Sequence, residues 1–171
     1  DICEDGSLLL MDLGAKYRGY CADITRTYPV NGTYTERQRQ VYDIVLAANR
    51  EVVKTAKPGM TLKELNEIAK KVLAAGCMNL GLIEKEDEID TYYMHGVSHH
   101  LGIDVHDVTA ASNETLQPGA IITDEPGLYI DEWEIGIRIE DDLLITEIGC
   151  ECLSEAIIRD PDEIKAFMKD R

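Results

Sequence analysis

The chain has 171 residues, 44% of them hydrophobic, and a formal net charge of −16 at pH 7. This length and composition suffice for one domain with a buried core, and the negative charge argues against nucleic acid or an anionic membrane surface as a partner, because both would be repelled. No apolar run approaches the roughly 18 residues that a membrane span requires, and five cysteines without a CxxC pair fit reduced thiols and a cytoplasmic location.

Two strands are predicted at the start of the chain. Residues 7–13 form an apolar run of strand length that ends at Gly14. Residues 20–30 form a second run, with Gly19 before it and Pro29 near its end.

Two capping boxes predict two consecutive helices. Thr35 with Gln38, and Thr61 with Glu64, have the pattern in which each side chain accepts a hydrogen bond at a helix start. Apolar residues follow each box at helical spacing, and the sequence Lys-Pro-Gly at 57–59 ends the first helix.

The second half of the chain is predicted to contain a loop, two strands and a last helix. Residues 84–90 are an acidic surface loop, 120–125 a strand, and 134–146 a long strand with alternating apolar residues. A helix begins at 160–163, with proline at its first helical position. We therefore expect one α+β domain over residues 1–171.

Two aspartates lie on the first two predicted strands. If these strands pair, Asp12 and Asp23 can project from one face of the sheet a few ångströms apart. Like charges placed directly opposite each other destabilise a sheet, so the pair calls for a cation.

The histidines lie together in residues 93–107 of the sequence. Imidazole binds divalent metals and titrates near neutrality, so this segment can supply both a ligand and proton-transfer groups. We expect His100 to be structural and assign functional roles to the other three, which are His95, His99 and His106.

Two glutamates follow at or near the ends of later strands. Pro126 ends the strand directly after Glu125, so that carboxylate stands at a rim. Arg138 and Glu140 share one face of the predicted strand 134–146. Arg138 therefore either forms a surface ion pair or holds a carboxylate of the active site or of a substrate.

One imidazole among four carboxylates is a ligand set for two hard divalent cations, which predicts metal-assisted hydrolysis. The set consists of Asp12, Asp23, His99, Glu125 and Glu140.

The segments that contain this set resemble those of the pita-bread metallopeptidases. The resemblance is carried by MDLGAKYRGYCADITRT, MHGVSHHLGIDVHD, EPGLYI and GIRIEDD. It is strongest to the branch of aminopeptidase P (Xaa-Pro aminopeptidase) and prolidase, and weaker to methionine aminopeptidases, which use the same five ligand types. It implies a pita-bread (creatinase/aminopeptidase-like) fold, a mainly antiparallel curved sheet with helices on its outer face.

The resemblance also implies a role for each ligand. Asp12 would chelate one metal, Asp23 and Glu140 would bridge both, and His99 and Glu125 would complete the second site. The two ions would be Mn²⁺, with Co²⁺, Fe²⁺ or Zn²⁺ as substitutes. They would hold a bridging hydroxide as the nucleophile, with Glu125 as the general base.

The remaining expected roles concern the substrate. His95 and His106 resemble the histidines that contact the peptide and assist its tetrahedral intermediate, and Arg138 resembles the arginine beside the metal site. The implied reaction removes the residue that precedes proline from the N-terminus of a peptide.

Members of this branch have an N-terminal domain and a longer catalytic domain. The resemblance therefore implies that residues 1–171 are the C-terminal part of a catalytic domain, incomplete at the N-terminus and inactive by itself if the site needs the rest. It also implies a homo-oligomer for the full-length protein. Three functions stay open: an Xaa-Pro aminopeptidase, a prolidase that cleaves only Xaa-Pro dipeptides, and a non-catalytic pita-bread module that binds protein or peptide.

Overall fold

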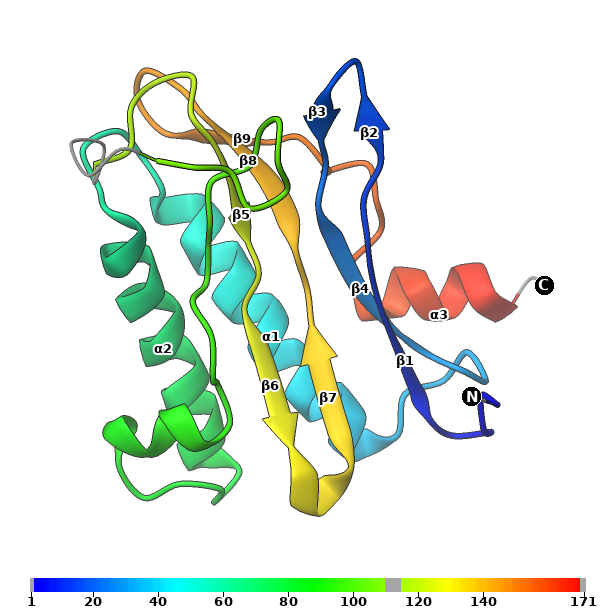
Figure 1. Ribbon diagram of the computed structural model, residues 1–171. Coiled ribbons are helices and arrows are strands. Elements are labelled where there is room, and N and C mark those ends of the chain that lie inside the picture. The colour runs from blue at the N-terminus through cyan, green and yellow to red at the C-terminus, as the bar shows by residue number, and fades with distance from the viewer. Residues whose placement is uncertain (1, 110–114, 170–171) are drawn as a thin grey trace.

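The computed structural model describes residues 2–109 and 115–169, and Figure 1 shows two long helices beside a layer of antiparallel strands. In chain order the elements are β1 (Leu8–Leu13), β2 (Lys16–Tyr17), β3 (Tyr20–Cys21), β4 (Ile24–Pro29), α1 (Glu36–Thr55), α2 (Leu62–Asn79), the 3₁₀ helix η1 (Glu86–Thr91), β5 (Ile121–Asp124), β6 (Gly127–Ile130), the 3₁₀ helix η3 (Asp131–Trp133), β7 (Ile135–Arg138), β8 (Asp141–Ile145), β9 (Cys150–Cys152) and α3 (Pro161–Lys169). Within the described ranges, no helix combines the length and apolarity needed to cross a membrane.

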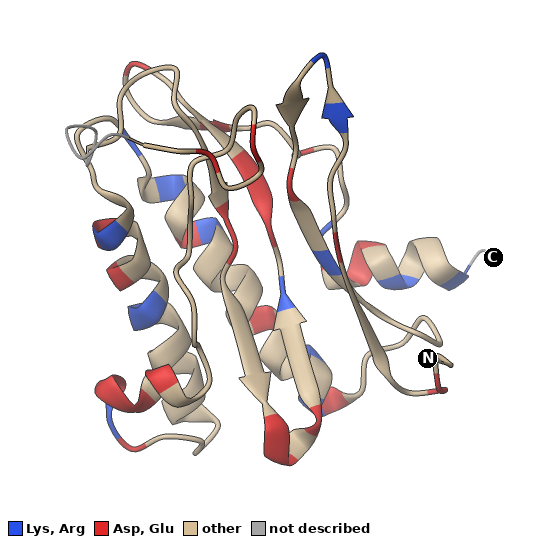
Figure 2. Ribbon diagram, in the orientation of Figure 1, with Lys and Arg blue, Asp and Glu red and all other residues tan. Residues whose placement is uncertain are grey.

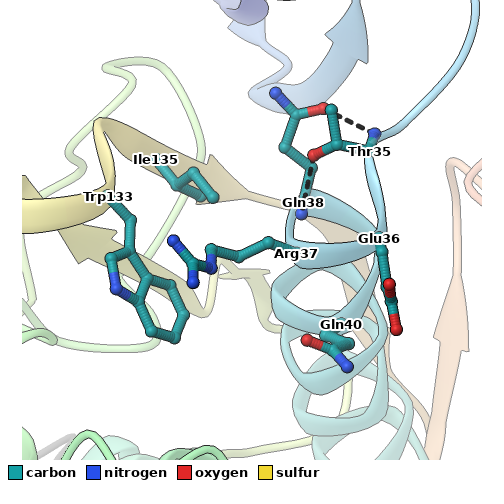
Figure 3. A pocket seen from close by; sticks show the side chains of 7 residues that line it. All are labelled: Thr35, Glu36, Arg37, Gln38, Gln40, Trp133 and Ile135. Atoms are coloured by element: carbon teal, nitrogen blue, oxygen red, sulfur yellow. Dashed lines mark hydrogen bonds between the residues drawn. The ribbon is translucent and has the colours of Figure 1, made fainter.

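Both predicted capping boxes are present. Thr35 Oγ1 accepts a hydrogen bond from the Gln38 amide at 3.3 Å, and Gln38 Oε1 accepts one from the Thr35 amide at 2.9 Å (Figure 3). Thr61 Oγ1 likewise accepts from the Glu64 amide at 3.1 Å, and Glu64 Oε2 accepts from the Thr61 amide at 2.8 Å. These bonds satisfy amides that have no partner inside the helix, so local sequence sets where α1 and α2 begin.

A pocket opens beside the first turn of α1. Arg37 lies over the Trp133 ring at 4.4 Å from its centroid, and Ile135 lines the pocket next to them (Figure 3). None of the predicted metal ligands lines this pocket.

The core lies between the two long helices and the strands. α1 packs against α2 and against β5, β6, β7 and β9. Fully buried side chains from the helices and strands fill this layer, among them Val41, Val45, Val52, Leu65, Leu73, Ile122, Leu128, Ile137 and Leu143. Burial of these apolar faces is the main force that holds the helices against the sheet.

The predicted strand 20–30 is wrong as a single element, because the chain breaks pairing at residues 22–23. The Cys21 amide bonds to Gly102 O at 2.7 Å, and the Asp23 amide bonds to the Asp142 carboxylate at 3.3 Å. Asp23 therefore precedes β4, and the residue of β4 opposite Asp12 is Thr25. At this break the chain after β1 and the chain before β4 approach closely. Residue 14 must be glycine, because a Cβ there would lie 1.6 Å from Ala22 O.

The predicted strand 134–146 is also divided. β7 pairs with β6, whereas β8 pairs with β5 and β9. Between them the Glu140 amide donates to Thr25 O at 3.0 Å, so the chain turns towards β4 at this point. The partner strands β5 and β6 are separated at the same level, where Pro126 has no backbone N–H to donate.

The acidic segment 84–90 is more ordered than predicted. It forms most of the 3₁₀ helix η1, with Ile89 buried in the core and Asp90 paired with Lys70 of α2 at 2.6 Å.

Candidate metal centre

Five chain segments bring the predicted ligands together. Asp12 lies in β1, Asp23 before β4, His99 in the loop before β5, Glu125 after β5, and Glu140 between β7 and β8. Figure 2 shows acidic segments of neighbouring strands beside one another in the middle of the strand layer. Among residues 2–109 and 115–169, three trios have ligand atoms within 4.8 Å of one another: Asp12–Asp23–Glu140, His99–Glu125–Glu140 and Asp23–His99–His106.

The imidazole lies between the carboxylates of two ligands. His99 Nε2 is 3.5 Å from Asp23 Oδ2 and 3.5 Å from Glu125 Oε1. Its other ring nitrogen, Nδ1, lies 3.0 Å from His100 O. A bond from Nδ1–H to this carbonyl would leave Nε2 free to bind a metal.

Burial and crowding raise the pKa values of three carboxyl groups of this cluster. Burial, with the charges of Glu125 and Asp23, raises the pKa of Glu140 to about 8, although a hydrogen bond from Thr25 opposes the shift. Burial also raises the pKa of Glu125, and burial together with the Asp12 charge raises that of Asp23. Such a cluster must bind protons or cations. Its oxygen-rich donor set with one imidazole fits divalent first-row metals.

A chain of polar contacts runs from the histidine segment to the first aspartate. His95 Nε2 lies 2.8 Å from the Tyr129 hydroxyl, and Arg138 Nη1 donates to the same hydroxyl at 3.0 Å. Arg138 Nη2 then reaches Asp12 Oδ2 at 2.5 Å. Arg138 therefore holds a carboxylate of the cluster, but that of Asp12 rather than of its predicted neighbour Glu140.

His106 and His95 flank the cluster on either side. The His106 ring is exposed and its centroid lies 4.2 Å from that of His99. His95 Nδ1 is 4.0 Å from Glu125 Oε2. The side chain of His100 has no hydrogen bond among the described residues, whereas its backbone pairs with Ile122. The structure thus brings together every predicted site residue.

Sequence reasoning missed two residues of this site, Tyr129 and Thr25. Thr25 Oγ1 donates to Glu140 Oε2 at 2.5 Å and accepts from Arg138 Nε at 3.1 Å. Thr25 is two positions after Asp23, so strand alternation offered a signal for it. Tyr129 lies in the EPGLYI segment, but its contacts depend on the pairing of β6 with β7, which brings Arg138 near, and on His95 from a segment 34 residues away.

The fold and this cluster define a class of protein. The chain belongs to metallopeptidase family M24, whose model matches residues 1–147. It is 41% identical to the Xaa-Pro aminopeptidase of Escherichia coli (strain K12), over 97% of this chain and 42% of that protein.

Solved structures of aminopeptidase P are also similar to this chain. A Bacillus anthracis protein assigned to aminopeptidase P is 53% identical and superposes with a TM-score of 0.94, over 98% of this chain and 40% of that one. An E. coli aminopeptidase P variant in complex with substrate has 40% identity and a TM-score of 0.92, over 98% of this chain and 43% of that one. A Zn-substituted form of the E. coli enzyme in complex with product has 41% identity, the same TM-score of 0.92 and the same coverage, 98% and 43%. These matches confirm the predicted pita-bread fold.

The chain spans less than half the length of these relatives.

Proposed function

We propose that the protein containing this chain is a metal-dependent aminopeptidase that removes the residue before proline from a peptide N-terminus. The observation that carries this proposal is the convergence of Asp12, Asp23, His99, Glu125 and Glu140 from five segments on one centre. The similarity to Xaa-Pro aminopeptidase supports the choice of substrate.

We propose two divalent cations for this centre, with Mn²⁺ as the native metal and Zn²⁺, Co²⁺ or Fe²⁺ as substitutes. The first cation would lie among Asp12, Asp23 and Glu140, and the second among His99, Glu125 and Glu140. When bound, such cations lower the pKa of the attacking water and polarise the scissile carbonyl.

We assign the general base for that water to Glu125. Burial raises its pKa towards neutrality, and Thr123 Oγ1 lies 3.4 Å from its Oε1. A carboxylate with a raised pKa accepts a proton more readily than an ordinary one at neutral pH.

His95 and Arg138 organise the side of the centre next to Glu125 and Asp12. The Tyr129 hydroxyl joins them, with contacts of 2.8 and 3.0 Å. We assign His95 and His106 to binding of the substrate backbone and Arg138 to orientation of Asp12. Arg138 keeps its charge at any working pH, so its guanidinium can orient the Asp12 carboxylate throughout that range.

Peptide cleavage tests the proposal directly. The Mn²⁺-loaded protein is incubated with Ala-Pro-Ala, Ala-Ala-Ala and Ala-Pro, and release of alanine is followed by mass spectrometry. We expect cleavage of Ala-Pro-Ala, its loss in EDTA, and a decrease of about 10²-fold or more in Glu125→Gln, which keeps the size but not the base. Failure to cleave Ala-Pro-Ala contradicts the proposal, and cleavage of Ala-Pro alone would show a prolidase instead.

The remaining proposals concern location and assembly. We propose a cytoplasmic location, which the five free cysteines support. We also propose that the full-length protein is a homo-oligomer. β1 pairs only with β4 in the described part of the chain, and Leu9, Met11 and Leu13 on its outer face are exposed. Light scattering of the intact protein gives the number of copies.

A further inference from the structure

A second set of charged side chains is buried directly behind the candidate ligands. In the β5–β8 pair, Thr123 is opposite Asp142 and Asp124 is opposite Asp141. Side chains alternate along a strand, so Asp124 and Asp141 point away from the side that carries Glu125. Both are fully buried.

Asp141 is surrounded by donors from three parts of the chain. Its Oδ1 accepts from Arg26 Nη2 at 2.7 Å and from Ser154 Oγ at 2.6 Å. Its Oδ2 accepts from Arg159 Nη1 at 2.9 Å. Two arginines thus compensate the charge of Asp141.

Asn49 of α1 connects the two facing carboxylates. Its Nδ2 lies 3.0 Å from Asp124 Oδ2 and 3.1 Å from Asp141 Oδ2. Burial and the charge of Asp141 raise the pKa of Asp124 well above its usual range, which favours the neutral form of Asp124, and Asn49 donates to both carboxyl groups.

The buried set is bonded to the backbone of the ligand segments. Arg26 Nη1 donates to Glu140 O at 2.6 Å. Ser154 Oγ accepts from the Asp142 amide at 3.3 Å, and the Asp142 carboxylate accepts from the Asp23 amide at 3.3 Å. The buried set therefore bonds to the backbone of Glu140 directly and to that of Asp23 through Asp142.

Stability alone does not account for this arrangement. A buried ion pair is often no more stabilising than apolar side chains of the same size. In addition, Asn49 Oδ1 and Asp124 Oδ1 are buried without a hydrogen-bond partner among the described residues. Such atoms carry a desolvation penalty, which indicates that the network serves another purpose.

We propose that these side chains form a buried support that positions Asp23 and Glu140 to bind divalent cations. The inference rests on the metal centre proposed above. The support consists of the buried Arg26, Asn49, Asp124, Asp141 and Ser154, together with the partly buried Arg159.

Binding of Mn²⁺ to the intact protein, measured by titration calorimetry, tests the support. Arg26→Lys keeps a positive charge but loses the fork that joins Asp141 to Glu140 O. Ser154→Ala removes a single hydroxyl and is expected to fold. Since residues behind metal ligands typically contribute about 10–100-fold in affinity, we expect Kd to rise at least about tenfold in Arg26→Lys and several-fold in Ser154→Ala.

Leu73→Ala is the matched control, because Leu73 is fully buried in α2 and belongs to the core rather than to the support. It should lower the unfolding temperature but leave Kd within about twofold of the original value, as expected for a variant remote from the ligands. Equal Kd values in Ser154→Ala and the original protein, or weakening that simply follows the unfolding temperature in all variants, would overturn the proposal. If Arg26→Lys does not fold, Ser154→Ala decides.

Amide hydrogen exchange of the metal-free protein provides a readout that does not depend on cations. The support predicts faster exchange at Asp23 and Glu140 in Ser154→Ala and Arg26→Lys, but not selectively in Leu73→Ala. Unchanged exchange at both amides would overturn the support. If the original protein binds no Mn²⁺, the proposed function is wrong. The exchange rates of the Asp23 and Glu140 amides then test by themselves whether the buried side chains position these two residues.

Discussion

Thr25 and Glu140 are joined twice, once through side chains and once through the backbone. Thr25 Oγ1 donates to Glu140 Oε2 at 2.5 Å, and the Glu140 amide donates to Thr25 O at 3.0 Å. Thr25 is fully buried and Glu140 is 2% exposed. The two bonds fix the carboxylate that takes part in two of the three ligand trios.

Replacing Thr25 by valine should therefore weaken metal binding. Valine has nearly the same shape but no hydroxyl, so the buried Glu140 carboxyl group loses a hydrogen bond. We expect a loss of about 1–3 kcal/mol in unfolding free energy and a rise of about tenfold in the Kd for Mn²⁺. Thr25→Ser should retain most of the unfolding free energy and most of the affinity for Mn²⁺. An unchanged Kd in Thr25→Val would show that the Thr25 hydroxyl does not contribute to metal binding. Calorimetry and thermal unfolding measure the two effects.

Replacing Asp23 by asparagine should separate metal binding from stability. The change removes an anionic ligand, so Mn²⁺ binding and peptide cleavage should both be lost. It also removes repulsion with Asp12, which contributes to the raised pKa of Asp23. The metal-free variant should therefore have a higher free energy of unfolding than the original protein.

Asp43→Asn serves as the control for that change, because Asp43 is exposed on α1 and pairs only with Arg39 among the described residues. It should leave Mn²⁺ binding intact. Retained hydrolysis in Asp23→Asn would contradict the assignment of Asp23 as a ligand.

The metal-free protein should lose stability as pH rises from about 5 to about 8. Glu140 has a pKa of about 8 in the folded chain, raised from 4.5 mainly by burial. The folded state therefore retains a proton that the unfolded state has already released, and its advantage declines as pH rises through this window. Bound cations replace that proton and should flatten the dependence.

Denaturant unfolding at several pH values, in EDTA and in Mn²⁺, checks this expectation. Glu140→Gln should reduce the slope in EDTA, because the amide does not titrate. A stability that increases steadily over the same range in EDTA would contradict the raised pKa of Glu140.

Gly76→Ala should destabilise the protein, against the usual preference of helices for alanine. An exposed helical site would gain about 1 kcal/mol from this change. Here the new Cβ would lie 2.5 Å from Ile44 Cγ2 of α1, so overpacking should instead cost about 1–3 kcal/mol. In the background of Ile44→Ala the clash disappears, and Gly76→Ala should there be neutral or stabilising. Thermal unfolding of the four proteins forms the test, and simple additivity would argue against the contact.

Local chemistry made part of this protein predictable from sequence. Thr35 and Thr61 begin the helices through bonds to residues three positions away, and Pro126 ends β5's run because it has no amide. The five ligand types were also visible, because carboxylates and imidazole are rare in apolar strand segments without a purpose. Sequence alone therefore predicted the candidate ligands of the centre and the resemblance to the family.

Tertiary structure decided where the strands break and what surrounds the ligands. Cys21 and Glu140 direct their amides to Gly102 and Thr25, far away along the chain, so neither break follows from periodicity. Asp124 and Asp141 became a buried pair only through the register of β5 with β8. Hydrogen bonds and charge interactions depend on the distance between atoms in space. A sequence pattern with a period of two or 3.6 residues gives the face of a strand or helix on which a residue lies, but not its distance from residues far along the chain.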